Sequence, residues 1–353
     1  MFLDKFSEAN KKSQIKPMGG LKLNKPLTEM NISGDVGIEF ELEGSSLLTA
    51  GYFDGLTGSK SRAVWLAKRD GSLRNGGMEY VVSEPIYYDE ITPMVEGFFE
   101  RFEKHPTSKI KNTNRCSTHV HVNVSSFKVN ELTSAIALWL TLEEALIAWC
   151  GEERVNNHFC LSAKNSTSVT DVWTKFLENG EWIAQKYSAL NLRTIMSYGS
   201  LEFRCASGSH EPTYPIMWAK FLYNLVYFAK DKYRNPLSIA YDLSERGPLA
   251  IFREICERDW EVLEAFYKEV LDVYEENMLA FETTCMEGFR ETQAFLFPFN
   301  WDEWMEEIDK EYVPNPFEQN SSKQKMPRTA QILNRTRVRA EVAEVAEVVP
   351  EWN

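Results

Sequence analysis

Three short segments of this chain alternate metal-binding or charged residues with apolar residues. They are 37–43 (GIEFELE), 117–123 (STHVHVN) and 200–205 (SLEFRC). Because a β-strand sends successive side chains to opposite faces, each segment would present one polar face and one apolar face. If the three strands lie in one sheet, its back is a core and its front carries carboxylate, imidazole and guanidinium groups. That layout is typical of a site for a cation and a phosphate group.

The first segment places Glu39, Glu41 and Glu43 on one strand face. Strand geometry separates these carboxylates by roughly 6.5 to 7 Å, close enough to repel one another if they are desolvated. A hard divalent cation relieves that repulsion, and oxygen-rich sites suit Mg²⁺ or Mn²⁺. The alternative is an amphipathic strand whose acidic face meets water, and the motif alone favours neither.

The other two segments carry imidazoles and an acid–guanidinium pair. His119 and His121 would point the same way, which suits metal ligation or phosphate contact, although an isolated pair of this kind is more often a half-exposed strand. Glu202 and Arg204 share a face, and Arg193 is predicted on the preceding strand. An acid with two guanidiniums suits a metal and a phosphate or carboxylate, whereas one Glu–Arg pair alone is more often a salt bridge.

Length and composition describe a folded globular protein. The 353 residues are 43% hydrophobic, enough for a large core, and the formal net charge of −13 disfavours a broad nucleic-acid surface. The six cysteines are far apart, which favours reduced thiols in a cytoplasmic protein over a disulfide framework or a zinc ribbon. Without about 20 consecutive apolar residues or a secretory signal, the pattern predicts no spanning helix.

The chain divides into an arm, a catalytic region and a tail. Residues 1–33 are polar and rich in lysine, and residues 314–353 form a polar linker, a basic stretch and a tail with a three-residue period. The domain between them, 34–313, is predicted to hold the motifs in 34–208 and a helical part in 213–313. The tail is predicted to pack on a neighbour or to fold on binding.

Within the domain, the pattern predicts strands up to about residue 126, followed mostly by helices. Further strands are expected at 63–66 and 78–83, and Tyr198-Gly199 is expected to form a tight hairpin between 191–197 and 200–206. Asn130 is the expected N-cap of a buried helix. Helices are predicted at 89–104, 131–150, 170–178, 214–234 and 259–283.

Residues 55–61 (GLTGSKS) look superficially like a phosphate loop. They lack the spacing of that motif and have no clear strand before them or helix after them. We therefore interpret them as a flexible loop, with a lid over the site as the minor alternative. No dinucleotide fingerprint, nucleophile elbow or Cys–His nucleophile pair is apparent.

The order of the motifs between 34 and 208 resembles the amidoligase family, a branch of the carboxylate–amine ligases with the glutamine synthetase catalytic fold. The resemblance is carried by the acidic strand, by Asp70-Gly71-Ser72-Leu73 followed by Gly77-Met78-Glu79, by residues 116–122, and by Leu190-Asn191-Leu192 before 198–204. It implies an α+β domain with a curved, mainly antiparallel sheet and helices packed on its back. It also implies ATP- and Mg²⁺- or Mn²⁺-dependent amide formation, in which a phosphorylated carboxylate is attacked by an amine.

The resemblance also implies roles for individual residues. The implied metal ligands are Glu39, Glu41, Glu79, His119 and Glu202. Arg193 and Arg204 would hold the transferring phosphoryl group or the acyl carboxylate, with His121 in support. Asp70 and Ser72 match a turn at the rim of the nucleotide site, and His119 and Arg204 would also contact the nucleotide. Two of the three acidic positions on the first strand satisfy the motif, which leaves Glu43 without an assigned role.

Two other functions fit the same residues. A metal-dependent hydrolase would use the histidines and carboxylates to activate water, and a structural or virion protein would keep the ligase fold without turnover. The implied partners of a ligase are small-molecule or peptide carboxylates and amines, with no membrane. Cytoplasmic location, in a host cell if the gene belongs to a phage, and homo-oligomerisation or assembly through the terminal arms are further expectations.

Overall fold

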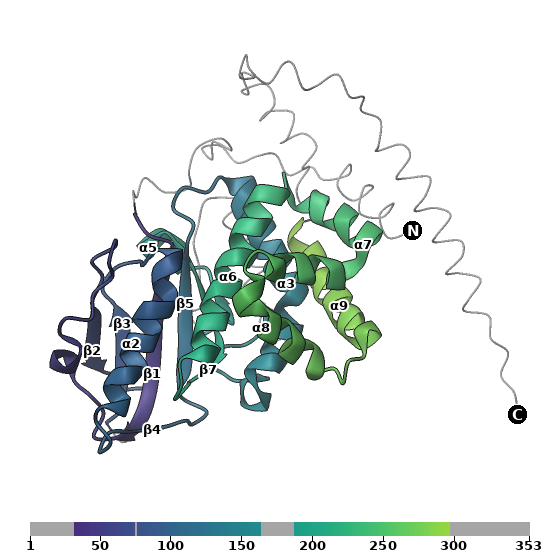
Figure 1. Cartoon of the computed structure of the whole chain (residues 1–353). Helices are drawn as coiled ribbons and strands as arrows, with labels where there is room; N and C mark the ends of the chain where they lie inside the picture. The colour runs from purple at the N-terminus through teal and green to yellow at the C-terminus, as the bar shows by residue number, and fades with distance from the viewer. Residues whose placement is uncertain (1–31, 75, 164–186, 297–353) are drawn as a thin grey trace, which may run out of the picture. The chain divides into compact units, whose positions relative to one another are not determined.

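The structure is a computed structural model that describes residues 32–74, 76–163 and 187–296. These residues belong to one compact unit that spans 17–296. The predicted arm up to residue 31, the predicted helix at 170–178 and the tail at 314–353 lie outside the described residues. Figure 1 shows that strands and helices are segregated within the unit, with most helices gathered beside β7 rather than between the strands.

The sheet is antiparallel at every strand pair, which confirms the predicted α+β architecture. Its order is β2-β3-β1-β5-β7-β6, with β4 pairing beside the end of β1. The strands are β1 Val36–Ser45, β2 Trp65–Arg69, β3 Met78–Val82, β4 Lys109–Lys111, β5 Ser117–Asn123, β6 Leu190–Asn191 and β7 Ser200–Ser207. All three alternating segments of the sequence are therefore central strands of one sheet.

The strand register brings the polar residues of different strands into cross-strand rows. Residues directly opposite in an antiparallel pair share a face of the sheet. The pairs are Glu39 with His119, Glu41 with both Glu79 and Ser117, His121 with Glu202, and Lys68 with Glu79. The front face of the sheet therefore collects the polar groups that the alternation predicts.

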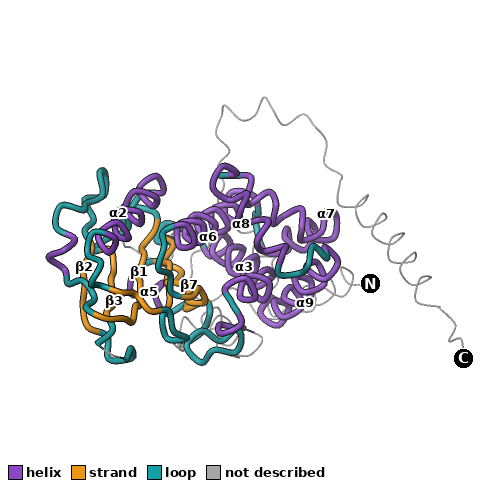
Figure 2. The backbone as a smooth tube through the Cα atoms, turned by 60° about the horizontal axis from the view of Figure 1, so that its bottom comes forward, coloured by secondary structure: helices purple, strands orange, loops and turns teal. Residues whose placement is uncertain are grey.

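The back face of the sheet is a core. Ile38, Phe40 and Leu42 of β1 are fully buried, and the Phe40 ring lies 5.3 Å from that of Trp65 and 4.9 Å from that of Phe98, between ring centroids. Phe98 belongs to helix α2, which packs against the apolar back face of the sheet at β1 and β3 (Figure 2). This apolar packing fixes the rotation of β1, and hence the direction in which its glutamates point.

In the described part of the chain, the helices are more numerous than the sequence pattern predicts. They are α2 Ile91–Glu103, α3 Val129–Cys150, α5 Thr194–Tyr198, α6 Thr213–Lys232, α7 Pro236–Glu257, α8 Trp260–Asp272 and α9 Met278–Leu296, with short 3-10 turns η1 Ala50–Phe53, η2 Tyr88–Glu90 and η3 Glu152–Arg154. The single helix predicted at 259–283 is wrong: α8 ends at Asp272, and Glu275 and Glu276 adopt left-handed φ values of 51° and 57° before α9 begins. Helix α7 was not predicted, because Gly247-Pro248 marks a break and the helix kinks there.

Helix α3 is the buried helix predicted from its composition, but it begins earlier than expected. The Glu131 carboxylate accepts a hydrogen bond from the Lys128 amide at 2.9 Å, and the Asn130 side chain instead donates to the Arg234 carbonyl. By length and hydropathy α3 meets the minimum for a membrane-spanning helix, contrary to the expectation that no segment would. Because 83% of its most apolar window is buried inside the structure, we interpret it as a core helix.

The connection between β6 and β7 is a short helix rather than the predicted tight hairpin. The Thr194 hydroxyl donates to the carbonyls of Asn191 and Ser200, which holds α5 between the two strands. Gly199 then ends α5 in the left-handed conformation, with φ 64° and ψ 28°, where glycine has no steric cost. Arg193 accordingly stands at the start of a helix and not on a strand.

Candidate active site

The front face of the sheet forms the floor of a cavity of about 590 Å³. The cavity follows β1 from Gly37 to Glu41, with α5 on one side and β2 and β3 on the other. All predicted site residues line it except His119 and Ser72. Those that line it are Glu39, Glu41, Asp70, Glu79, His121, Arg193, Glu202 and Arg204.

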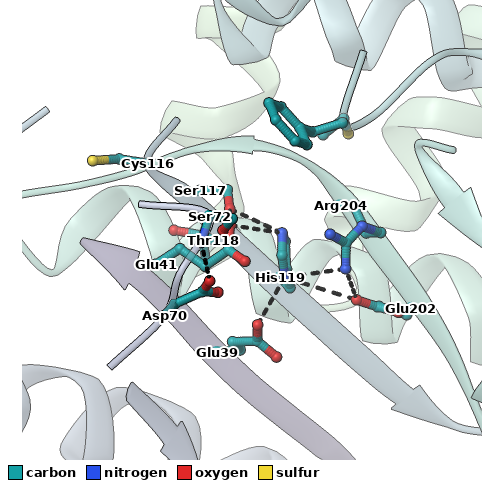
Figure 3. A network of polar contacts seen from close by, with 12 residues as sticks. Glu39, Glu41, Asp70, Ser72, Cys116, Ser117, Thr118, His119, Glu202 and Arg204 are labelled. Carbon is teal, nitrogen blue, oxygen red and sulfur yellow. Dashed lines mark hydrogen bonds and ion pairs between the residues drawn. The ribbon is translucent and has the colours of Figure 1, made fainter. Parts of the chain in front are cut away.

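His119 lies beneath the cavity floor and is in contact with polar groups on several sides (Figure 3). Its side chain is 2% exposed. Nδ1 is 3.2 Å from Glu39 Oε1 and 3.7 Å from Glu202 Oε1, whereas Nε2 is 2.9 Å from Ser117 Oγ. The imidazole therefore joins the acidic strand β1 to the acid–guanidinium pair on β7.

The surroundings of His119 fix its protonation state. Burial, assisted by the charge of Arg204, lowers the pKa of His119 to about 4, so the ring is neutral at pH 7 and carries one N–H. The Ser117 hydroxyl donates its only proton to Glu41 Oε2, so it accepts from His119 Nε2. The proton therefore sits on Nε2, and Nδ1, which carries the lone pair, lies 3.2 Å from Glu39 Oε1 and 3.5 Å from Arg204 Nη1.

A lone pair facing a carboxylate oxygen is unfavourable unless a proton or a cation lies between them. Glu39, Glu41 and His119 each have a ligand atom within 4.8 Å of the other two. Among the described residues, neither Glu39 nor Glu41 has a Lys or Arg partner within ion-pair distance. Burial, together with the charge of Glu202, raises the pKa of Glu39. Two carboxylates and a neutral imidazole fit a divalent cation.

Glu202 and Arg204 form a buried ion pair at the edge of this group. Although burial opposes its ionisation, the charge of Arg204 lowers the pKa of Glu202 to about 2. Asn191 donates to the other Glu202 oxygen, so this carboxylate is both charged and well held. Arg204 Nε is buried and has no acceptor within the described residues, which leaves one donor for a bound anion.

Glu79 and Asp70 lie at the opposite end of the cavity. Glu79 is 2.6 Å from the Lys68 ammonium, and burial, together with the charge of Glu39, raises the pKa of its carboxyl. Asp70 lines the cavity, and its Oδ1 accepts from the Ser72 amide at 2.6 Å. The exposed Ser72 side chain does not line the cavity, so the structure brings only Asp70 of this turn to the site.

Comparison with known families decides which class of protein carries this site. Residues 68–225 match the family model whose description is "Putative amidoligase enzyme". Residues 68–225 belong to the amidoligase family. This confirms the family expected from the motifs, and with it an amide-bond-forming ligase as the class of enzyme.

The amidoligase segment contains most of the site but not all of it. It includes Glu79, His119, Glu202 and Arg204, whereas Glu39 and Glu41 precede it. The two groups meet only because β1 pairs between β3 and β5. The first acidic strand thus joins the amidoligase site through the fold rather than through the matched segment.

Two further comparisons add little to the amidoligase assignment. The solved complex between the prokaryotic ubiquitin-like protein Pup and its ligase PafA is similar to this chain at 15% sequence identity and a TM-score of 0.30. The similarity covers 88% of this chain and 74% of that chain. No curated protein sequence matches the chain.

Several residues of the amidoligase site could not be identified from the sequence motifs alone. Ser117 orients His119, Asn191 holds Glu202, and the Ser200 hydroxyl lies 3.0 Å from His121 Nδ1. Each lies inside or next to a recognised motif, which is the signal that could have found it. Their roles depend on the strand register, which the motifs do not give.

Ser117, His119 and Glu39 superficially resemble the nucleophile, base and acid of a serine hydrolase. Ser117 is 3% exposed and does not line the cavity, and its hydroxyl donates a hydrogen bond to Glu41. A buried hydroxyl that donates to a carboxylate is a poor nucleophile. Ser117 therefore positions His119 and does not attack a substrate.

Glu43 and the 55–61 loop lie outside the cavity lining. Glu43 is buried and accepts from the Arg74 amide at 2.6 Å and the Thr113 hydroxyl at 3.1 Å, so it holds the turn that carries Asp70. The loop is tied to Glu90, whose carboxylate accepts from the Lys60 amide at 2.6 Å. Against the effect of burial, such hydrogen bonds lower the pKa of Glu90 to about 2. The lid alternative for this loop finds no support in that arrangement.

Proposed function

We propose that the protein is an ATP- and Mg²⁺-dependent amide ligase that works through an acyl phosphate. The observation that carries the proposal is the cluster of Glu39, Glu41 and neutral His119, whose ligand atoms lie within 4.8 Å of one another and whose two carboxylates have no Lys or Arg partner among the described residues. That donor set suits a divalent cation. A carboxylate–amine ligase needs a divalent cation for its nucleotide.

The residues that would hold the cation are Glu39, Glu41 and His119, with Glu79 and Glu202 as further ligands. A bound Mg²⁺ or Mn²⁺ neutralises phosphate oxygens. Glu202 stays ionised because Arg204 pairs with it, and Lys68 stabilises the charged form of Glu79. Arg204 and Lys68 would thus keep Glu202 and Glu79 in the charged form that binds a cation.

Arg204 would bind the transferring phosphoryl group or the acyl carboxylate through its unpartnered Nε. Arg193, exposed at the start of α5, would approach the same groups from the cavity wall, and His121 would support them. Asp70 would lie at the rim of the nucleotide site. In the proposed reaction, a substrate carboxylate oxygen attacks the γ-phosphorus of ATP and ADP leaves. An amine nitrogen then attacks the acyl carbon, loses a proton and releases phosphate.

The cavity is of the right size for this chemistry. Its volume of about 590 Å³ lies within the roughly 300–1,000 Å³ of small-molecule sites. The acid and the amine are proposed to be small molecules or peptide groups. The glutamine synthetase-like relationship of the sheet and the cytoplasmic location belong to the same proposal.

The direct test is to incubate the protein with ATP, Mg²⁺ and pools of amino acids, carboxylic acids and polyamines, and to measure ADP release and amide products. ADP release that requires both an acid and an amine is expected. Glu39→Gln removes one of the proposed cation ligands. Its matched control is Glu264→Gln, on the exposed face of α8, because both substitutions remove one carboxylate charge. Stoichiometric zinc without any effect of ATP would favour a hydrolase. Absence of nucleotide binding at millimolar ATP and Mg²⁺ would contradict the ligase and leave the structural-protein alternative.

A further inference from the structure

The ladder between β5 and β7 is irregular at the site. Thr118 pairs with Ala206 and Val120 with Phe203, so Arg204 and Cys205 both stand against the single residue between them on β5, His119. A position where two residues of one strand lie opposite one residue of its neighbour is a β-bulge. Such a bulge bends the strand and redirects a side chain. At this bulge the Arg204 side chain lies between His119 and Glu202.

A buried guanidinium binds the backbone of the bulge. Arg154 is 2% exposed and lies in η3, directly after the end of α3. Its Nε donates to the Cys205 carbonyl at 2.8 Å and its Nη2 to the Arg204 carbonyl at 2.8 Å, while Nη1 is 3.4 Å from the Cys116 carbonyl on the β5 side. One planar group therefore ties both bulge residues to the chain entering the neighbouring strand.

Arg154 has no carboxylate partner among the described residues, so its charge is held by carbonyl dipoles. A buried charge without a counter-ion is costly, and a simpler apolar packing residue would avoid that cost. The planar guanidinium offers five donors in a fixed fork, whereas a lysine ammonium donates from one point and cannot span three carbonyls. The geometry therefore requires the particular shape of arginine.

We propose that Arg154 is a positioning residue for Arg204. It holds the carbonyls of the bulge, and in this way sets the direction in which Arg204 reaches His119 and Glu202. The placement of Arg204 does not depend on the proposed function. The consequence for ligand binding does, because it assumes that Arg204 binds phosphate or carboxylate.

The first experiment follows the Arg204 side chain itself. In full-length ¹⁵N-labelled protein, the Arg204 Nε–H signal is identified by its disappearance in Arg204→Lys. Because this N–H is buried, slow exchange with solvent is expected in the wild type, and at least tenfold faster exchange with a shifted signal is expected in Arg154→Lys. The matched control is Arg258→Lys, which alters an exposed ion pair with Asp231 and should leave the Arg204 signal unchanged. A lower melting temperature with an unchanged Arg204 signal would overturn the proposal.

If Arg154→Lys does not fold, the wild-type protein still decides the question. The Nε–H groups of Arg154 and Arg204 should then exchange through the same local opening, with equal dependence on low concentrations of denaturant. Different denaturant slopes would show that the two groups open independently, which contradicts the proposal.

A second experiment uses Mn²⁺ with ATP as the probe. Arg154→Lys should weaken binding, and it should have no further effect in an Arg204→Lys background, because it acts through Arg204. Additive losses would overturn the proposal. If the wild type does not bind Mn²⁺–ATP, the proposed function fails, and the exchange measurements alone decide the role of Arg154.

Discussion

At the scale of single residues, the position of the single N–H proton of His119 organises the site. The Ser117 hydroxyl donates a hydrogen bond to Glu41 and accepts one from His119 Nε2, so the lone pair of His119 lies on Nδ1, the nitrogen nearer to Glu39. In the absence of a cation, a proton on Glu39 can fill the same gap, in agreement with its raised pKa. A metal ion bound at the proposed position would therefore compete with this proton, and cation binding should release a proton.

Glu39→Gln is expected to remove the cation without harming the fold. Burial disfavours the ionised carboxylate, as its raised pKa shows, so a neutral amide of the same shape removes a penalty on the folded state. Mn²⁺ affinity should fall at least tenfold, while the free energy of unfolding without metal should stay the same or rise. Urea melts and Mn²⁺ titration by electron paramagnetic resonance measure the two quantities.

The control for this variant is Glu264→Gln, which removes a surface carboxylate of an i,i+4 pair. Both its Mn²⁺ affinity and its unfolding free energy should match the wild type. If Glu39→Gln bound Mn²⁺ as tightly as this control, Glu39 would not be a ligand.

At the scale of elements, the strands were predictable and their connections were not. Alternation in 37–43, 117–123 and 200–205 is local information, and it put on one face the residues of these strands that line the cavity: Glu39, Glu41, His121, Glu202 and Arg204. The α5 turn escaped prediction because Thr194 hydrogen-bonds two carbonyls across it, and α7 escaped because Gly247-Pro248 marks a break. The role of Arg154 depends on a bulge that only the three-dimensional pairing shows.

Helix α3 contains a titratable group that should affect stability apart from the site. Glu143 is buried, accepts from Trp139 Nε1 at 2.9 Å and from the Ala163 amide at 2.7 Å, and burial raises its pKa to about 8. The folded state therefore holds this proton more tightly than the unfolded chain does. The stabilisation is complete below the unfolded pKa of 4.5 and is lost as the pH rises through about 8.

Glu143→Gln should flatten this pH dependence. The wild type should lose on the order of 4 kcal/mol of unfolding free energy to Glu143 between about pH 4.5 and 8, whereas the neutral amide has no proton to lose. At low pH the variant should be about 1 kcal/mol less stable, since one amide hydrogen bond is replaced by a poorer contact. Urea melts from pH 5 to 8.5 measure both curves, and parallel curves would show that Glu143 does not titrate there.

At the scale of the whole molecule, the formal net charge of −13 opposes the binding of another polyanion such as ATP. The cavity adds carboxylates to that background, and only Lys68, Arg193 and Arg204 supply positive charge among its lining residues in the described part of the chain. Nucleotide binding should therefore depend strictly on a divalent cation. Selective binding of the native state raises the melting temperature by mass action.

Mg²⁺ with ATP at about 100 times the dissociation constant should stabilise the protein by about 2.7 kcal/mol, which corresponds to a rise of about 4 to 5 °C in the melting temperature of a chain of this length. ATP with a chelator should give no rise, because the carboxylates of Glu39 and Glu41 would then repel the phosphates without screening. Mg²⁺ alone should give a smaller rise, and Glu39→Gln should abolish the difference between Mg²⁺–ATP and ATP with chelator. Thermal melts of the wild type and of Glu39→Gln under these three conditions and without ligand make the comparison. An equal rise with and without the cation would place the nucleotide away from the carboxylates, and so away from the front face of the sheet.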